Sequence, residues 1–397
     1  MIKVLVVFGT RPEAIKLCPL VLHLVAKPSQ FNVKVCVTAQ HRSMLDGILD
    51  RFGVVPDYDL NVMATNQTLS GLTARILERM QHVLRDAEPE VVLVQGDTTT
   101  TFAGALASFY EHIPVGHIEA GLRTGDLGHP FPEELNRVLT TRLAAIHFAP
   151  TERAARNLLS EGVQPERVLI TGNTGIDALL YTRTKLEQGD WNGFKAINVP
   201  SGKRLILITA HRRENHGEGL QGICEAVKRI AARGDVEVVY PVHPNPNVRN
   251  VVEKELRVVA GVRLVEPLDY VPFVDLMCRA SIILTDSGGV QEEAPSLGVP
   301  VLVLRSKTER QEAIEAGTAQ LVGTDPVVIV AHVNQILDSD GAQACSRRNP
   351  FGDGKACERI ARALLTGEHA TGSKNNELEF RGVCESPLER DSFHVAR

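Results

Sequence analysis

Short apolar runs alternate with helix-like segments along most of this chain, and the alternation stops once and then starts again. Strands that alternate with helices form βαβ units, which build a parallel sheet with helices on its faces. Between 69 and 83, apolar residues recur at helical spacing and predict one crossover helix. The strands are expected at 3–8, 33–38, 91–95, 115–118 and 145–148, and again at 205–209, 236–240, 262–265, 282–285 and 299–304. The sequence thus predicts an α/β fold with two Rossmann-like parallel-sheet domains that face each other across a cleft.

The length of the chain also favours two domains. Its 397 residues exceed the roughly 250–300 residues at which a single hydrophobic core stops growing. The polar stretch 184–203 has no strong periodicity and is the expected linker between an N-terminal domain, 1–183, and a C-terminal domain, 204–355. A last helix at 356–366 is a candidate to cross back to the first domain. Residues 367–397 are polar and irregular, so we expect a flexible tail.

Composition excludes several classes of function. A net charge of −5 argues against nucleic acid as a partner, because phosphate backbones require a basic surface. The seven cysteines are an odd number and include no Cys-x-x-Cys pair, which is typical of reduced thiols. The apolar run at 4–8 is too short for a signal-peptide core, and no later segment approaches the length of a membrane span. We therefore expect a cytoplasmic protein.

Three carboxylates follow strand-like runs in the first half of the chain. Asp97, Glu119 and Glu133 lie in short turns, with Arg123 and Arg137 close behind them. Because the carboxyl ends of parallel strands line the ligand cleft of an open sheet, these acids should converge there and exchange protons with a bound molecule. The alternative is that they cap helices, which Asp and Glu often do.

The turn after the first strand offers cations. It lacks the Gly-x-Gly-x-x-Gly pattern, which counts against a tightly held nicotinamide cofactor. Arg11 and Lys16 stand at a strand-to-helix turn, where a helix N-terminus favours anions. Pro12 suits the first turn of that helix. The alternative is that both cations are ordinary surface residues.

The strongest pattern of the second half follows the strand at 282–285. Ser287, Gly288 and Gly289 let the backbone come close to a phosphate, and Ser287 can donate a hydrogen bond to it. In the helix that follows, Glu292 or Glu293 can accept hydrogen bonds from a ribose diol. An ordinary turn with an acidic first helical turn is the alternative. A site for a diphosphate and a ribose is the better interpretation.

Two histidines also follow strands of the second series. His211 and His216 lack the His-Glu-x-x-His pattern, so a zinc site is poorly supported. A hydrogen-bonding or cationic role of His211 beside a phosphate fits better. His243, which lies between prolines, is either a satisfied loop histidine or a ligand-binding residue.

Further groups follow at the same sheet edge. Phe273 is either a core aromatic or a stacking platform for a base, and core is the default for a lone Phe. Arg310 is preceded by Arg305 and Lys307, which make this turn positive. Anion-binding groups on the second domain and proton-transfer acids on the first suit a nucleotide sugar that lies across the cleft.

Several long motifs occur in order along the chain. They are Phe8-Gly-Thr-Arg-Pro-Glu-Ala-Ile-Lys, Gly96-Asp-Thr-Thr-Thr-Thr, His117-Ile-Glu-Ala-Gly-Leu-Arg-Thr-Gly-Asp, Gly172-Asn-Thr, His211-Arg-Arg-Glu and Asp286-Ser-Gly-Gly-Val-Gln-Glu-Glu-Ala. With these motifs the chain resembles the bacterial non-hydrolysing UDP-N-acetylglucosamine 2-epimerases over about residues 1–366. The resemblance implies a GT-B-type fold, a homodimer without metal or nicotinamide cofactor, and interconversion of UDP-GlcNAc and UDP-ManNAc for surface polysaccharide. Some members of that family also bind UDP-GlcNAc as an allosteric activator.

The resemblance also implies roles for single residues. Asp97, Glu119 and Glu133 match the catalytic acids, and His211 belongs to the same catalytic set beside the diphosphate. The implied substrate-binding residues are Arg11, Ser287, Gly288 and Gly289 at the diphosphate, Glu293 at the ribose, Phe273 at the uracil, and Lys16, Arg137, His243 and Arg310 in support. The sequence departs from the family pattern at Ala210, Gln311 and Gly175.

Two other enzyme classes fit the same groups. A hydrolysing relative would release free ManNAc and UDP, and a GT-B glycosyltransferase would need an acceptor and would not invert C2. A non-catalytic UDP-sugar sensor would have little use for three acids at the cleft.

Overall fold

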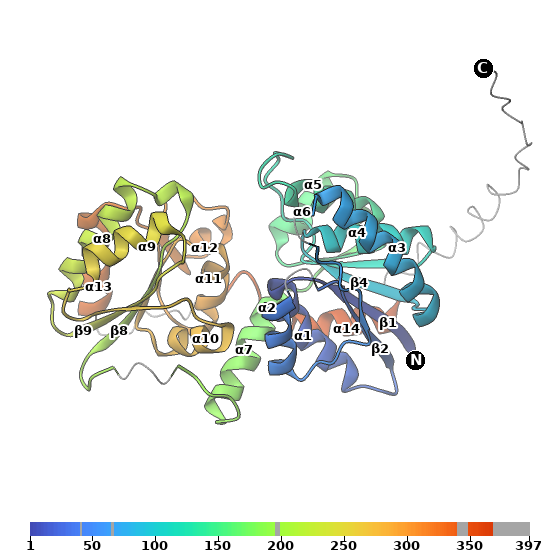
Figure 1. Ribbon diagram of the computed structural model, residues 1–397, viewed down its shortest axis with the longest axis horizontal. Helices are drawn as coiled ribbons and strands as arrows, with labels where there is room; N and C mark the ends of the chain where they lie inside the picture. The colour runs from blue at the N-terminus through green and yellow to red at the C-terminus, as the bar shows by residue number, and fades with distance from the viewer. Residues whose placement is uncertain (40–41, 65–66, 195–198, 340–347, 368–397) are drawn as a thin grey trace, which may run out of the picture.

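The computed structural model describes residues 1–39, 42–64, 67–194, 199–339 and 348–367. These residues form two lobes, each built on a parallel β-sheet with helices on both faces (Figure 1). The first lobe contains β1 (Ile2–Phe8), β2 (Phe31–Val37), β3 (Tyr58–Asp59), β4 (Val91–Gln95), β5 (Val115–Ile118), β6 (Ile146–Ala149) and β7 (Val168–Ile170). The second contains β8 (Arg204–Thr209), β9 (Val236–Pro241), β10 (Val262–Val265), β11 (Ile282–Thr285), β12 (Val301–Val303) and β13 (Ala319–Leu321). The predicted fold class is confirmed.

All the expected strands are present, with ends shifted by a few residues. The strand predicted at 33–38 begins earlier, at Phe31, and the one predicted at 299–304 is confined to Val301–Val303. The strands β3, β7 and β13 were not predicted. They are only two or three residues long, and part of each is exposed, so none has the run of about four to eight apolar residues that marks a buried strand.

The order of strands reverses at the middle of each sheet. The first sheet runs β3-β2-β1-β4-β5-β6-β7 and the second β10-β9-β8-β11-β12-β13. A crevice therefore opens beyond the carboxyl ends of β1 and β4 in the first lobe, and of β8 and β11 in the second, which is where open parallel sheets bind ligands.

Helices cover both faces of each sheet. In the first lobe they are α1 (Arg11–Val25), α2 (Arg42–Phe52), α3 (Leu69–Ala87), α4 (Thr99–Tyr110), α5 (Glu133–Leu143), α6 (Glu152–Ser160), the 3-10 turn η1 (Pro165–Arg167) and α7 (Thr174–Glu187). In the second they are η2 (Arg213–Asn215), α8 (Glu218–Ala231), α9 (Pro246–Leu256), α10 (Tyr270–Arg279), α11 (Gly288–Glu293), η3 (Ala294–Leu297), α12 (Gln311–Glu315) and α13 (Pro326–Asp338). Within the described residues, none of these helices has the length and apolar character needed to cross a bilayer.

The two lobes share one buried core. Helix α7 packs on α1 of the first lobe and on α10 and α11 of the second. One cluster of buried side chains accordingly runs from Val4 and Leu17 through Ile176 and Leu179 to Val274. The lobes are thus joined by packing as well as by the chain.

The segments between and after the lobes differ in detail from the prediction. Helix α7 continues to Glu187, so the first residues of the predicted linker are helical. The remainder of that linker is only partly described, since 195–198 lie outside the described residues, as does the predicted tail beyond Gly367. The last helix, α14 (Ala356–Thr366), packs against α1 and α7 within the first lobe (Figure 1).

Candidate active site

The turn after β1 is fixed by a buried acid. Glu13 forms a capping box with Thr10 at the start of α1, and its Oε2 accepts hydrogen bonds from the backbone N–H of Gly9 at 2.9 Å and of Thr10 at 2.7 Å. Its other oxygen accepts from the Thr98 hydroxyl at 2.6 Å. Gly9 is required here because a Cβ would lie 2.0 Å from the Thr38 hydroxyl. Glu13 therefore holds the ends of β1 and β4 in register, which places the residues of both turns.

Glu119 lies at the carboxyl end of β5 and is buried among donors. Lys16 Nζ lies 2.6 Å from its Oε1 and 2.7 Å from its Oε2, and Gln95 and Asn173 also donate to the carboxylate. Burial acts to raise the pKa of Glu119, but the charge of Lys16 and its hydrogen bond outweigh it and leave the pKa below its ordinary value. The carboxylate is therefore ionised at neutral pH.

Asp97 follows β4 and pairs with the Arg137 guanidinium. Arg137 donates from Nε at 2.9 Å and from Nη2 at 2.5 Å to Asp97 Oδ2. The same guanidinium donates from Nη1 at 2.8 Å to the buried Glu134, whose other oxygen accepts the backbone N–H groups of Thr124 and Gly125. Glu134 thus fixes the loop before α5 and holds Arg137 toward Asp97.

These contacts bear on the alternative that the three acids cap helices. The cap of α4 is the Thr98 hydroxyl, which accepts from the Thr101 N–H at 3.1 Å, and not Asp97. Glu119 accepts only from side chains among the described residues. Glu133 is the first residue of α5, and its carboxylate has no hydrogen-bond or ion-pair partner among the residues that the structure describes. Neither Asp97 nor Glu119 serves as a helix cap.

In the second lobe a buried carboxylate organises the ends of β8 and β11. Asp286 Oδ2 accepts from the backbone N–H of His211 and of Arg212, each at 2.8 Å, and from the Asn215 amide at 3.0 Å. Its Oδ1 lies 3.5 Å from His211 Nδ1. The His211 ring stacks on His243 with centroids 5.2 Å apart. Burial lowers the pKa of His211 against the opposing charge of Asp286, so the ring is held in place as a neutral imidazole at neutral pH.

One hydrogen-bonded network crosses from lobe to lobe. The Asn173 amide nitrogen, after β7, lies 3.0 Å from Glu119 Oε1 and 2.8 Å from Oε2 of Glu292 on α11. Glu292 Oε1 accepts from Arg310 Nε at 2.7 Å, and the Glu292 carbonyl accepts from the Asn349 amide. The acid of the first lobe and the cation of the second are therefore tied together through two side chains.

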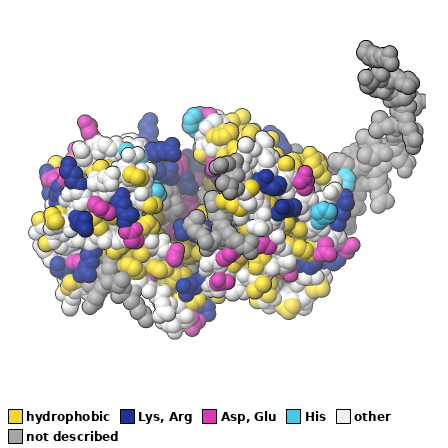
Figure 2. All heavy atoms as spheres, viewed as in Figure 1, with side chains coloured by type: hydrophobic (Ala, Val, Ile, Leu, Met, Phe, Trp, Pro, Cys, Tyr) yellow, Lys and Arg dark blue, Asp and Glu magenta, His cyan; other side chains and the backbone are white. Residues whose placement is uncertain are grey.

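The network borders a cleft of about 360 Å³ between the lobes. Figure 2 shows the recess between the two lobes on one face of the molecule, with Lys and Arg side chains gathered on the left-hand lobe at its rim. The cleft is lined by Arg11, Pro12, Ile15, Lys16, Asn173, Gly175, Ile176, Tyr270, Phe273, Ser287, Gly289, Val290, Glu292, Glu293 and Arg310. Arg11 presents a guanidinium that has no hydrogen-bond or ion-pair partner among the described residues.

Most predicted binding residues thus lie together at this cleft, and Gly288, Arg137 and His243 are not among the residues that line it. Phe273 lines the cleft and also packs on the shared core, so stacking on a base stays a prediction. Gly288 lies under Arg310, since a Cβ there would be 3.1 Å from the guanidinium carbon. Glu119 is reached through Lys16 and Asn173. Asp97, Glu133, Arg137, His211 and His243 do not line this hollow.

Glu293 lines the cleft with a carboxyl group that is mostly protonated at pH 7. Burial and the neighbouring Glu292 raise its pKa to about 8, although Lys16 acts to lower it. A protonated carboxyl group can donate a hydrogen bond as well as accept one. Glu293 can therefore bind a neutral diol without adding negative charge beside a diphosphate.

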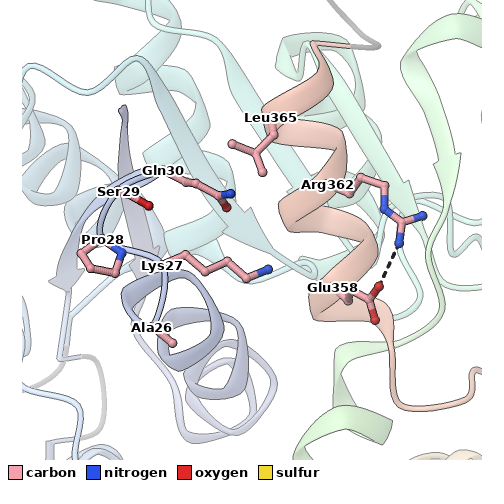
Figure 3. Close-up of a pocket in the computed structure, with 8 residues that line it drawn as sticks. All are labelled: Ala26, Lys27, Pro28, Ser29, Gln30, Glu358, Arg362 and Leu365. Carbon is pink, nitrogen blue, oxygen red and sulfur yellow. Dashed lines mark hydrogen bonds and ion pairs between the residues drawn. The ribbon is translucent and has the colours of Figure 1, made fainter.

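A second hollow, of about 410 Å³, lies between the end of α1 and α14 (Figure 3). Its lining includes Lys27, Gln30 and Leu365, and the pair Glu358 and Arg362 spans one turn of α14. None of the predicted site residues lines it. Among the described residues, no group of three or more His, Cys, Asp or Glu side chains could hold a metal ion.

Sequence reasoning missed the residues that connect the site. Asn173 falls within a motif but has no predicted role, because the strand β7 before it is too short and too exposed to be predicted from the sequence. In the sequence, Gln95 looks like the last residue of a strand and Asp286 like one residue of a Gly-rich turn. The only sequence feature that could have identified these residues is their position after the carboxyl end of a parallel strand.

The two parallel sheets and the cleft between them define a two-domain α/β protein of the GT-B type, with an ionised acid and several cations at the cleft. A family model described as UDP-N-acetylglucosamine 2-epimerase matches residues 23–365. The UDP-N-acetylglucosamine 2-epimerase of Salmonella typhimurium is 56% identical over 369 residues, which cover 91% of this chain and 98% of that relative. The chain belongs to the UDP-N-acetylglucosamine 2-epimerase family.

Solved structures agree with this assignment. The UDP-GlcNAc 2-epimerase from Neisseria meningitidis, crystallised with UDP-GlcNAc, is 50% identical with a TM-score of 0.81, over 92% of this chain and all of that one (100%). The enzyme from Methanocaldococcus jannaschii, in complex with UDP-GlcNAc and UDP, is 35% identical with a TM-score of 0.73, over 92% of this chain and 99% of that one.

Proposed function

We propose that this protein interconverts UDP-GlcNAc and UDP-ManNAc by inverting C2, and that no free sugar is released. The observation that carries the proposal is the ionised Glu119 behind a cleft that also holds the cations Lys16, Arg11 and Arg310. A proton-transfer acid and a diphosphate site then serve the same bound molecule, as the family membership leads us to expect.

The chemistry explains why both kinds of group are needed. The C2 proton of the sugar has no adjacent carbonyl, so its direct removal would leave an unstabilised carbanion. When the C1–O bond breaks, its electron pair leaves with UDP, and the C2 proton passes to a carboxylate as a C1=C2 double bond forms. UDP then adds back to this 2-acetamidoglucal while C2 receives a proton on the opposite face. The C1–O bond and the C2–H bond that break in the first step both form again in the second, so no water is consumed.

Different residues serve the proton transfer and the binding of the diphosphate. The three acids Asp97, Glu119 and Glu133 share the removal, return and support of the C2 proton. Arg11, Arg310 and Ser287 bind the diphosphate and stabilise its charge as it departs. His211, held by Asp286, donates a hydrogen bond beside it. Closure of the two lobes keeps the neutral glycal next to UDP until re-addition.

Incubation with UDP-GlcNAc in D2O tests the proposal. NMR of the recovered nucleotide sugars should find deuterium at C2 of both UDP-GlcNAc and UDP-ManNAc, with little free ManNAc. Accumulation of free ManNAc and UDP would replace the proposal with the hydrolysing reaction. UDP release that requires an added acceptor, without C2 exchange, would instead indicate a glycosyltransferase.

A further inference from the structure

Asn173 is the point at which the first lobe's acid meets the second lobe. Its amide nitrogen donates to Glu119 at 3.0 Å and to Glu292 at 2.8 Å, so both N–H bonds are committed, one to each lobe. Its amide oxygen accepts from the Gly175 N–H at 2.8 Å and caps α7. The backbone N–H donates to the Phe351 carbonyl at 2.7 Å. Every polar group of the side chain therefore has a fixed partner.

The neighbours of this amide are carboxyl groups and the cations that pair with them. Glu119 faces Lys16, and Glu292 faces Arg310, while Glu293 lies beside Glu292. Two carboxylate groups approach this one N–H₂ group from opposite lobes, and the amide bridges them. The amide satisfies both at once and adds no charge, which neither an Asp nor a Lys in its place could do.

We propose that Asn173 is a positioning residue that sets Glu119 in its working position only when Glu292 of the second lobe is in contact, and so couples lobe closure to proton transfer. In an open cleft Glu292 leaves with α11, and the amide loses the one contact that ties it and Glu119 to the second lobe. The acid is then fully oriented only over a substrate that has drawn the lobes together. The inference rests on the proposed reaction, because it assumes that Glu119 acts at C2.

Asn173 could instead serve only as the N-cap of α7, and substitutions distinguish this role from the positioning of Glu119. Asn, Asp and Ser are about equally good N-caps, so Asn173→Asp and Asn173→Ser should both retain the start of α7. Asn173→Asp keeps the shape of the side chain but loses both N–H donors and adds a charge. Asn173→Ser loses the reach to both carboxylates and adds no charge. A residue that only capped the helix would tolerate both changes.

The measurements are steady-state kinetics, C2 exchange in D2O and UDP binding by calorimetry. We expect kcat to fall about 10- to 100-fold in Asn173→Ser, the size of a lost hydrogen bond to a charged group, and further in Asn173→Asp. KM and the Kd for UDP should stay within about threefold, since the diphosphate site is intact. Loss of a donor to the ionised form raises the pKa of Glu119, so the acid limb of kcat/KM should move to higher pH in both variants.

Glu315→Gln is the matched control. Arg153 and Glu315 form another ion pair between the lobes, at 2.7 Å, away from the catalytic acids. This variant should keep the kinetics and pH profile of the unsubstituted enzyme. Thermal unfolding followed by the single Trp191 verifies that each variant is folded.

The results distinguish an error in the role of Asn173 from an error in the proposed reaction. If the unsubstituted enzyme exchanges C2 but both Asn173 variants keep its kcat and pH profile, the inference is wrong and the proposed function stands. A rise in KM with unchanged kcat would also overturn it, in favour of direct substrate binding by Asn173. If the unsubstituted enzyme shows no C2 exchange, the proposed function is wrong and this inference with it.

Discussion

At the scale of single residues, Asp97 carries the clearest prediction, because its carboxylate meets Arg137 at the end of β4. Asp97→Asn keeps the size and hydrogen-bonding capacity of the side chain but removes its basicity. We expect kcat to fall by about 100- to 10,000-fold, the contribution of a general acid or base. The Kd for UDP should change only a few-fold, because Asp97 does not line the cleft that holds the cations.

Steady-state kinetics and calorimetry check this prediction, with Asp353→Asn as the control. Asp353 pairs with Arg359 at 2.7 Å, away from the cleft, so the same chemical change there should leave turnover intact. Normal turnover in Asp97→Asn would remove Asp97 from the catalytic set.

For single residues, the sequence predicts where the site residues lie along the chain but not which residues they contact. The acids and cations could be located, because each follows an apolar run that ends a parallel strand. Their partners could not. Whether Glu119 meets Lys16, and whether Asn173 reaches Glu292, depends on which strands are neighbours and on how far the lobes close, and neither is encoded in periodicity.

At the scale of helices and strands, Asp177 on α7 holds the start of α14. Its carboxylate accepts from the backbone N–H of Cys357 at 2.9 Å and of Ala356 at 3.2 Å, although the two helices are far apart in sequence. Asp177→Ala should lower the free energy of unfolding by about 1–2 kcal/mol, as the loss of a cap does. Hydrogen exchange should become faster in α14 and stay unchanged in α13.

A matched substitution exists in the second lobe. Asp325 caps α13 through the Val327 N–H at 2.7 Å. Asp325→Ala should give the reverse pattern, with faster exchange in α13 and an unchanged α14. Equal protection of α14 in both variants would contradict the anchoring role of Asp177.

At the same scale, the sequence predicted the buried strands and the edge strand β10, but not the three short edge strands. Strands such as β4 and β11 are buried along their whole length and therefore appear as continuous apolar runs. The short strands β3, β7 and β13 pair with their neighbours over only two or three residues, so tertiary context and not local composition decides them.

At the scale of the whole molecule, the shared core predicts cooperative unfolding. Two domains in one chain usually meet over a small polar interface and melt separately. Here the buried cluster is continuous from β1 through α7 to α10. We expect one calorimetric transition whose van't Hoff enthalpy equals the measured enthalpy. Two resolved transitions would contradict a shared core.

The backbone conformation of Glu119 affects which substitutions the protein tolerates at this position. Its φ of 61° lies in the left-handed region, which costs a non-glycine residue on the order of 1–3 kcal/mol. Glycine at this position would relieve that cost but would leave Lys16 without its carboxylate partner, a loss on the order of 3–5 kcal/mol that outweighs the relief. Stability and activity therefore favour the same residue here, and a variant library screened only by thermal resistance should retain Glu119.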